Sequence, residues 1–352
     1  DASEDSSQFI VENLGITPKI LPEMRRSVNP YRDYKAFQEI KSIIRTFKPD
    51  IVHTHASKPG ALGRWAAHQM KVPVVIHTFH GHVFHSYFNE LTTGVYKTLE
   101  RRLAKMSTKI VAISDKQKEE LADHHGICAA DKIEVIPLGF DLQRFQDDQD
   151  EKRNVFRTEF KLGEDDIAIG IIGRLVPIKN HELFLKAIQF IKEKSKKRVK
   201  AFIVGDGQSR SAIEEQCTEL DLTYSNDSED DVDVYFTSWV KKVDYVNAGV
   251  DIVALTSKNE GTPVSLIEAQ ASNRAIVSTN VGGIENIVLP DLTALLSEPS
   301  DENRFMENLL KMVEDDKMRL AFGEKGWEFV ENKFHYQRLV KDITNLYDTL
   351  LS

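Results

Sequence analysis

The chain of 352 residues is long enough for two domains of ordinary size, and its net charge of -9 at pH 7 argues against general nucleic-acid binding. A hydrophobic fraction of 41% and a charged fraction of 29% are typical of a soluble globular protein, and no apolar run approaches the length of a membrane-spanning helix. The 2 cysteines cannot supply a disulfide framework, and residues 1–10 lack a secretory signal pattern, so we expect a cytoplasmic protein.

The first part of the chain alternates between helical and strand patterns. Residues 16–21 give a short strand pattern, and Asp33 can cap a helix whose apolar residues recur at helical spacing as far as Phe47. The next strands are predicted at 51–53, 74–78, 109–114 and 133–136, with helices at 60–70, 96–105 and 116–124. This alternation predicts an α/β domain over residues 1–145.

A charged segment with few apolar residues, 139–152, predicts an interdomain linker. The second domain, residues 146–332, alternates again. Its strands are predicted at 167–172, 201–204, 234–237 and 251–256, and its helices at 181–193, 209–220 and 264–272. The acidic segment 226–233 predicts a solvated surface loop, and residues 333–352 predict a C-terminal helix.

The stretch from Val250 to Val288 carries the strongest functional pattern. It contains a buried strand, a polar loop, a helix, a second strand and a glycine pair, which is the βαβ order of a nucleotide-binding domain. Pro263 suits the first turn of the helix, and the backbone N–H groups of Gly261 and Thr262 lie where a diphosphate gains most from the helix dipole. The loop therefore predicts an anion site.

Charged side chains accompany this loop. Glu260 and Glu268 are eight residues apart, so both can address one ligand, and carboxylates suit sugar and ribose hydroxyls. Arg174 and Lys179 follow the buried strand 167–172, so both cations can converge on a diphosphate leaving group. The alternative for each pair is a set of solvated surface residues.

Several spaced elements of the stretch match one family together. Glu260, Gly261, Pro263, Glu268, Ala269, Ala271 and the pair Gly282-Gly283 resemble the signature of retaining glycosyltransferases of family 4. The resemblance begins near Asp50 and implies the GT-B fold, in which two Rossmann-like domains face each other across a cleft and the C-terminal helix crosses back to the first domain. We expect Leu339, Ile343, Leu346 and Leu350 to form the buried stripe of that helix.

The resemblance also implies roles for single residues. Glu268 would hold the donor ribose and Glu260 the donor sugar, while Arg174 and Lys179 would neutralise the leaving phosphate. His80, beside Gly81, matches a histidine close to the transferred sugar, and the segment Trp239-Val240 matches one whose backbone reads the nucleobase.

One further feature concerns each of the two domains. Gly205 and Gly207 flank Asp206 in a turn that lets the backbone approach a ligand, as do Gly282 and Gly283. Family members open with a strand and a double-glycine loop that the given sequence lacks, so we expect an N-terminal domain incomplete at its start.

Neither a metal nor a cofactor is expected. His77, His82 and His85 have no cysteine, aspartate or glutamate at ligand spacing, and no DxD motif stands where a donor-bound metal would be expected. Because Arg174 and Lys179 can supply the positive charge, the chain is expected to work without a metal. No carboxylate of the first domain resembles a covalent nucleophile, which favours front-face displacement.

The sequence thus predicts a cytoplasmic hexosyltransferase that moves a sugar from a nucleotide-diphosphate donor, a UDP-sugar, to a saccharide or lipid-linked glycan in surface polysaccharide synthesis. The alternatives are a GT-B-fold UDP-sugar epimerase and a non-catalytic sugar-nucleotide binding protein. A basic stretch near an aromatic cluster suggests peripheral contact with the inner face of a membrane, and a solvated helix face is the alternative. The stretch consists of Lys97, Arg101, Arg102, Lys105 and Lys109.

Overall fold

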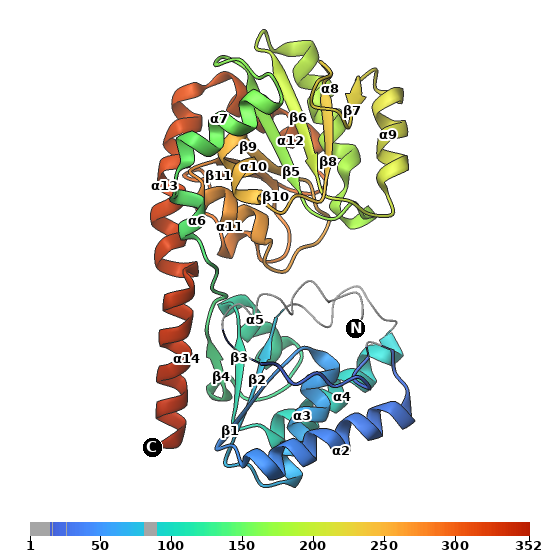
Figure 1. Ribbon diagram of the computed structural model, residues 1–352, viewed down its shortest axis with the longest axis vertical. Coiled ribbons are helices and arrows are strands. Elements are labelled where there is room, and N and C mark those ends of the chain that lie inside the picture. Colours follow the sequence, from blue (N-terminus) through green and yellow to red (C-terminus); the bar gives the residue numbers. More distant parts are fainter. Residues whose placement is uncertain (1–14, 16, 26, 81–89) are drawn as a thin grey trace. The chain divides into compact units, whose positions relative to one another are not determined.

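The computed structural model describes residues 15, 17–25, 27–80 and 90–352. It divides into two compact units (Figure 1). Unit 1 consists of Asp1–Pro137 and Val340–Ser352, and unit 2 consists of Leu138–Leu339. The aromatic cluster near the basic stretch, which consists of Val83, Phe84, Tyr87 and Phe88, lies outside the described residues, as do His82 and His85.

Unit 1 contains, within its described residues, a four-stranded parallel sheet in the order β1-β2-β3-β4. The strands are β1 (Ile51–His55), β2 (Val74–Phe79), β3 (Lys109–Ala112) and β4 (Ile133–Val135). The helices are α2 (Pro30–Phe47), α3 (Ser57–Gln69), α4 (Glu90–Met106) and α5 (Asp115–Glu119), with a π-helical turn at Glu120–His124 and a 3-10 turn at Ala130–Lys132. Every residue of β2 is buried, as expected for an inner strand covered on both faces.

The start of unit 1 corrects two predictions. Residues 17–21 form no strand. Asp33 does not precede the first helix but lies inside it, because Pro30 takes the first helical position and Asn29 is the cap. The Asn29 side chain accepts hydrogen bonds from the backbone of Tyr31 and Arg32 at 3.1 Å, and the Asp33 carboxylate accepts one from the Asn29 N–H at 3.1 Å.

The last helix returns to unit 1, as expected. Helix α14 (Tyr336–Leu351) enters that unit at Val340. Leu346 is buried, and the other residues of the predicted stripe, Leu339, Ile343 and Leu350, are partly buried. The hydroxyl of Tyr347 lies 2.7 Å from Nδ1 of His53 on β1, so the helix is tied to the sheet by a polar contact as well as by apolar packing.

Unit 2, all of which the structure describes, is built on a seven-stranded parallel sheet in the order β11-β10-β9-β5-β6-β8-β7. The strands are β5 (Ile167–Ile172), β6 (Val199–Val204), β7 (Tyr224–Ser225), β8 (Val234–Ser238), β9 (Ile252–Leu255), β10 (Ala275–Thr279) and β11 (Ala294–Ser297). The helices are α6 (Gln143–Gln146), α7 (Gln149–Glu159), α8 (His181–Lys194), α9 (Arg210–Glu219), α10 (Val243–Gly249), α11 (Val264–Ala271), α12 (Glu302–Glu314) and α13 (Asp316–Phe334), with 3-10 turns at Pro177–Lys179 and Ile284–Asn286. Two separate apolar clusters cover the two faces of this sheet, which explains why its strands are continuous hydrophobic runs.

The prediction of an interdomain linker at 139–152 is wrong. This segment forms α6 and the first residues of α7, and both belong to unit 2. Of its large apolar residues, Leu142 and Phe145 are buried in the core of unit 2, and Phe140 is partly buried against the same core. The spacing of three residues between Leu142 and Phe145 places them on one side of a helical turn, so a short helix can bury both although its neighbours are charged.

The predicted acidic loop is only partly solvated. The carboxylate of Asp231 accepts hydrogen bonds from Lys200 at 2.6 Å and from Arg198 at 2.7 Å. The carboxylate of Asp233 accepts one from Lys192 at 2.9 Å and one from the backbone of Thr223 at 2.9 Å. The loop therefore joins the ends of β6, β7 and α8.

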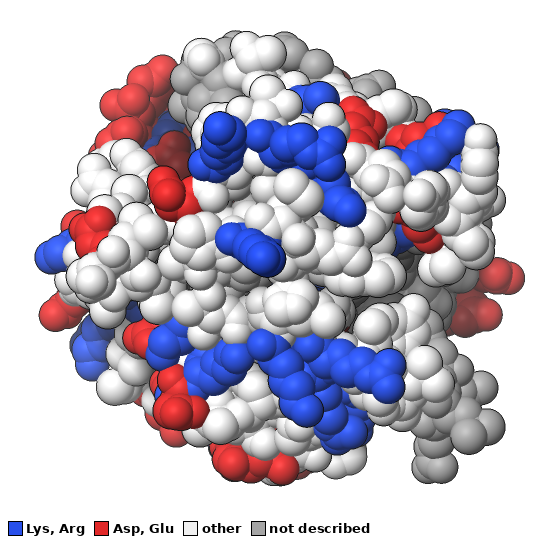
Figure 2. Space-filling model, turned by 90° about the horizontal axis from the view of Figure 1, so that it is seen from below, with Lys and Arg blue, Asp and Glu red and all other residues white. Residues whose placement is uncertain are grey.

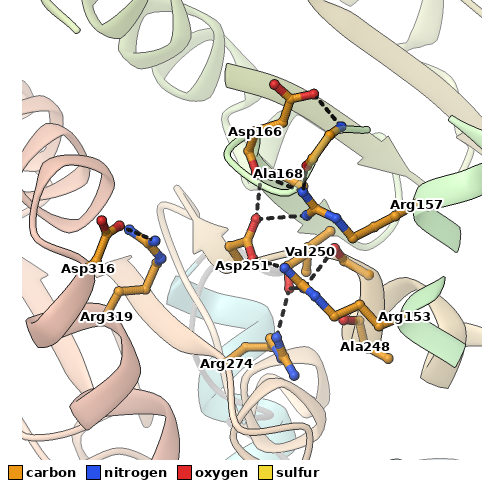
Figure 3. A network of polar contacts seen from close by, with 12 residues as sticks. Arg153, Arg157, Asp166, Ala168, Ala248, Val250, Asp251, Arg274, Asp316 and Arg319 are labelled. Carbon is orange, nitrogen blue, oxygen red and sulfur yellow. Dashed lines mark hydrogen bonds and ion pairs between the residues drawn. The ribbon is translucent and has the colours of Figure 1, made fainter. Parts of the chain in front are cut away.

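An arginine and aspartate network ties together the amino ends of β5 and β9 (Figure 3). Arg153 and Arg157 of α7 bond the two carboxylate oxygens of Asp251 at 2.6 and 3.3 Å, and the Ala168 N–H donates to the same carboxylate at 2.8 Å. Arg274 donates to the Val250 carbonyl at 3.3 Å, and burial lowers its pKa to about 10. The network fixes the register of the two strands at the end opposite to the predicted loops.

Candidate active site

The order in which the chain adds strands to the sheet of unit 2 changes direction between β5 and β9. From β5 the order proceeds through β6 to β8 on one side, and from β9 through β10 to β11 on the other. All these pairs are parallel, so the loops after β5 and β9 leave the same edge as neighbours. Ligands of open α/β sheets bind at the carboxyl ends beside such a reversal, and the loops 173–180 and 256–263 occupy that place.

Lys179 and Glu260 meet between these two loops. The Lys179 Nζ lies 2.6 Å from Oε1 of Glu260, and the Ser257 hydroxyl donates to the same oxygen at 2.5 Å. The Thr256 hydroxyl donates to the Lys179 carbonyl at 2.9 Å, and the Lys258 N–H donates to the Ile178 carbonyl at 2.8 Å. The backbone contacts hold the two loops in register, so the charge pair occupies a defined position.

Arg174 lies one residue beyond the glycine that faces this lysine. A Cβ atom placed on Gly173 would be 3.8 Å from the Lys179 Nζ, so the ammonium group lies beside the start of the loop. The Arg174 side chain is exposed. Among the contacts of the described residues, it takes part in no hydrogen bond or ion pair. The arginine is thus a solvent-facing cation at the same edge of the sheet.

Helix α11 begins directly after the loop that holds Glu260. Pro263 is its N-cap rather than its first residue, with φ of -69°, and no side chain caps the first turn. Gly261 and Thr262 are partly exposed. The uncapped N-terminus therefore turns backbone N–H groups and the positive end of the helix dipole toward the loop where Lys179 lies.

At the glycines of the predicted site, the backbones of two neighbouring loops lie in close contact. A Cβ on Gly205 or Gly207 would run into the carbonyl of Gly173 or Leu175, and a Cβ on Gly282 would run into the carbonyl of Glu260. Gly205 and Gly282 also have φ of 137° and 58°, which disfavour a side chain. These glycines let neighbouring loops approach each other closely. The sequence suggested approach to a ligand and did not reveal this packing. Gly283 has the same relation to the Gly261 carbonyl.

Glu268 lies on α11, eight residues after Glu260, and different groups act on it. Burial raises its pKa to about 7, opposed by the positive charge of Arg144 and reinforced by the negative charge of Asp244. Its side chain is only partly exposed. The structure therefore separates the two glutamates: Glu260 is paired with a lysine, whereas Glu268 is a half-neutral carboxyl beside α6 and α10.

The segment after β8 combines an exposed ring with a fixed backbone. Trp239 is 66% exposed, and Val240 packs on the core of unit 2. Arg210 of α9, which the sequence patterns did not single out, donates to the Ser238 hydroxyl at 2.8 Å and lies 5.1 Å from the centre of the Phe236 ring. Arg210 is the first residue of α9, after the glycine turn, and no sequence pattern marks this position as functional.

In unit 1, His80 follows β2 and pairs with a second histidine. Its Nε2 lies 2.8 Å from Nδ1 of His55, at the end of β1. His77 is buried and bonded to the Thr54 hydroxyl at 2.9 Å, and burial lowers its pKa to about 2. Among the described side chains, no group of three or more His, Cys, Asp or Glu has an arrangement suited to a metal ion.

The basic stretch, which lies on α4 and at the first residue of β3, is divided between structural and solvent-facing roles. Arg101 donates to the carbonyls of His125 and Gly126 at 2.8 and 2.9 Å, and Lys109 donates to the Asp131 carbonyl at 2.8 Å. Arg102 and Lys105 are exposed. No helix in the described part of the chain is long and apolar enough to cross a membrane.

Comparison with known proteins places this chain in a family. The family model described as Glycosyl transferases group 1 matches residues 152–329, and the model described as Glycosyltransferase Family 4 matches residues 3–144. A relative from Escherichia coli, UDP-Gal:alpha-D-GlcNAc-diphosphoundecaprenol alpha-1,3-galactosyltransferase, is 30% identical over 334 residues, which cover 93% of this chain and 82% of the relative.

Solved structures agree on the fold. A glycosyltransferase from Rickettsia africae matches with a TM-score of 0.79 at 19% identity and covers 98% of this chain and 87% of its own. The Anabaena protein HepE in complex with UDP matches with a TM-score of 0.78 at 16% identity, over 98% and 89% of the two chains. These similarities confirm the expected GT-B fold. With the family models and the E. coli relative, they establish that the chain belongs to the group 1, family 4 glycosyltransferases.

Proposed function

We propose that this chain is a retaining hexosyltransferase that moves a hexose or N-acetylhexosamine from a UDP-sugar to a saccharide or lipid-linked glycan in surface polysaccharide synthesis. The contact between Lys179 and Glu260 carries the proposal, because it joins a cation and a sugar-binding carboxylate at the strand reversal. The E. coli relative is named for a UDP-galactose donor and a lipid-linked acceptor, which supports this choice of substrates.

In this proposal the loops of unit 2 hold the donor by its charges. Lys179 and Arg174 bind the diphosphate together with the backbone N–H groups of Gly261 and Thr262 at the start of α11. Glu260 accepts a hydrogen bond from a hydroxyl of the sugar, and Glu268 accepts hydrogen bonds from the ribose. These groups stabilise the negative charge that grows on the departing diphosphate, and the loss of one such contact typically lowers the rate by about 10²- to 10³-fold.

The transfer proceeds on one face of the sugar. The acceptor oxygen forms its bond to the anomeric carbon on the side from which the bond to the phosphate oxygen breaks. The departing phosphate takes the proton of the acceptor hydroxyl, so atoms and charge balance without a covalent sugar on the protein. NMR spectroscopy of the product should show the anomeric configuration of the donor, and mass spectrometry should find no glycosylated protein. An adduct would contradict this step.

We also propose that the transfer needs no metal ion, since two side-chain cations serve the diphosphate. Activity in excess EDTA should equal activity with added Mg²⁺ or Mn²⁺. An enzyme that stops in EDTA and recovers only with a divalent ion would contradict the proposal.

Peripheral contact of unit 1 with the inner face of a membrane is a separate part of the proposal. Lysine and arginine side chains gather across the middle of the face that Figure 2 shows, while acidic residues lie mostly toward its rim. Arg102 and Lys105 are exposed, and among the described residues they donate to no backbone carbonyl, unlike Arg101. Each basic residue near an anionic surface contributes about 1 kcal/mol.

Vesicle sedimentation tests this contact. The double variant R102E and K105E should lose binding to phosphatidylglycerol vesicles, whereas K194E with K196E, which changes the net charge equally on unit 2, should retain it. Equal loss in both variants would indicate an effect of net charge alone and would contradict a defined membrane face.

A screen of the purified chain against nucleotide sugars tests the main proposal. Nucleotide release should occur with one UDP-sugar and should require an acceptor such as a lipid-linked saccharide. The variant K179M should lose at least about 100-fold in kcat, and K196M, which changes an exposed lysine of the same unit, should not. Epimerised donor formed without an acceptor would instead show an isomerase, and donor binding without any turnover would show a binding protein.

A further inference from the structure

His55 and His80 share a hydrogen bond that restricts both rings. The bond joins Nδ1 of His55 to Nε2 of His80 over 2.8 Å. A neutral imidazole has one N–H donor and one bare nitrogen, so one of these two atoms must carry a proton and the other must not. Whichever arrangement holds, the proton on His55 determines the tautomer of His80.

Of the two arrangements, one suits both rings. If Nε2 of His80 donates, then both histidines carry their proton on Nε2, which is the tautomer that histidine prefers in water. If Nδ1 of His55 donates, both rings adopt the less favoured Nδ1–H form. The first arrangement leaves Nδ1 of His80 as a bare acceptor.

The His55 ring also contacts a third histidine, His53. It stacks on the His53 ring with centroids 4.5 Å apart and an interplanar angle of 27°. His53 in turn contacts the Tyr347 hydroxyl through Nδ1 and the Thr78 hydroxyl through Nε2, both at 2.7 Å. Because both nitrogens of His53 are engaged, this ring cannot turn freely and gives His55 a fixed surface.

The electrostatic surroundings favour neutral rings. Burial lowers the pKa of His53 to about 4 and also lowers the pKa of His55 and of His80. The neighbouring His77 is neutral as well, because burial and the positive charge of the buried Arg64 lower its pKa to about 2. At neutral pH the rings are therefore uncharged, and the tautomer argument applies.

We propose that His55 is a positioning residue that fixes His80 as the Nε2–H tautomer, so that Nδ1 of His80 accepts a hydrogen bond from a hydroxyl of the transferred sugar. The inference rests on the proposed function, since the hydroxyl belongs to the sugar that is transferred. It adds His55 on β1 to the residues that position His80. Tyr347 on α14 contributes indirectly, because it contacts His53, on which the His55 ring stacks.

NMR spectroscopy tests the tautomer without any turnover. In the full chain labelled with ¹⁵N-histidine, long-range ¹H–¹⁵N spectra at pH 8 should show His80 as the Nε2–H form, identified by its absence in His80→Gln. In His55→Ala the His80 signals should shift toward a mixture of both tautomers, and in His68→Ala, an exposed histidine of the same unit, they should not move. An Nδ1–H form in the wild type, or an unchanged spectrum in His55→Ala, would overturn the proposal.

Kinetics separate this inference from the proposed function. We expect His55→Ala to lower kcat about tenfold with little change in the donor KM, on the scale seen for groups that orient a functional histidine. His55→Asn should restore most of the rate, because its amide can take the place of Nδ1. If His80→Ala abolishes turnover and His55→Ala leaves kcat unchanged, the positioning role is wrong while the proposed function stands. If His80→Ala keeps full turnover, the inference fails together with the role of His80, while the proposed transfer stands; the proposed function itself fails if the wild type transfers no sugar in the screen.

Discussion

Two glutamates of one loop and the helix that follows it have different neighbours. Glu260 contacts the Lys179 ammonium and the Ser257 hydroxyl. Burial and the negative charge of Asp244 raise the pKa of Glu268, eight residues later, to about 7. Glu268 therefore changes charge within the physiological range.

Donor binding should therefore depend on pH through Glu268. In the proposed role, the carboxylate form would accept hydrogen bonds from both ribose hydroxyls, and this form is lost as pH falls through about 7. Calorimetric titration with the UDP-sugar chosen by the screen should show affinity falling between pH 8 and pH 6. Glu268→Gln should bind more weakly at pH 8 and show no such fall. A wild-type affinity that stays constant over this range would contradict the assignment.

The same group should affect stability with a defined sign. Its pKa in the folded chain is raised from 4.5 to about 7, so the folded chain holds more protons than the unfolded chain between these values. The contribution of Glu268 to the free energy of unfolding is present below pH 4.5 and is lost as pH rises toward 7. Urea unfolding at several pH values should show a smaller decline over this range in Glu268→Gln than in the wild type, and an equal decline would contradict the shift.

At the scale of elements, β5 and β9 are fixed at both ends. Their amino ends share the network around Asp251, and their carboxyl ends carry the loops joined by Lys179 and Glu260. The strands pair at Ile169 and Gly170. Because a shift of one strand past the other would separate the charge pair, the distant network helps to keep the site assembled.

Replacement of Asp251 by alanine should be costly. It leaves Arg153 and Arg157 without their carboxylate, and breaking a buried ion pair typically costs about 3–5 kcal/mol. Asp165→Ala, which removes an exposed carboxylate one residue before Asp166, should change the free energy of unfolding by less than about 0.5 kcal/mol. Equal effects in urea unfolding would show that the network contributes little.

The elements that could be predicted from the sequence are those with strong local patterns. The apolar runs of β5 and β9 gave strands close to those observed, and the predicted helices 181–193 and 209–220 match α8 and α9 closely. Asn273 takes the left-handed conformation after α11, with φ of 57°. The pairing of Lys179 with Glu260 could not be predicted, because it joins residues 81 positions apart, and neither could the contact of His55 with His80. Local patterns also missed α6, whose burial depends on the sheet it packs against.

At the scale of the molecule, the chain ends in the unit where it begins. Helix α14 leaves unit 2 after Leu339, and from Val340 on it belongs to unit 1, where Leu346 is buried and Tyr347 contacts His53. The fold of unit 1 therefore includes residues that lie more than 200 positions after its other elements in the sequence. This arrangement also connects the histidine cluster to helix α14.

Truncation of Leu346 should weaken unit 1 selectively. Leu346→Ala should lower the stability of that unit by about 2–3 kcal/mol through lost burial and the cavity left behind. Hydrogen exchange should accelerate at the amides of β1 and β2 and stay unchanged at those of β5 and β9. Val340→Ala, at a position 58% exposed, serves as the control and should alter neither set. Faster exchange in unit 2 alone would contradict the assignment of the helix.

The central claim is that the edge of unit 2 where Lys179 meets Glu260 binds the diphosphate of a sugar nucleotide. A crystal structure with UDP bound tests it most directly. The account predicts diphosphate oxygens within hydrogen-bond distance of the Lys179 ammonium and of the backbone at the start of α11, with the ribose on Glu268. A nucleotide bound elsewhere, with Lys179 and Glu260 still paired and remote from it, would contradict the account.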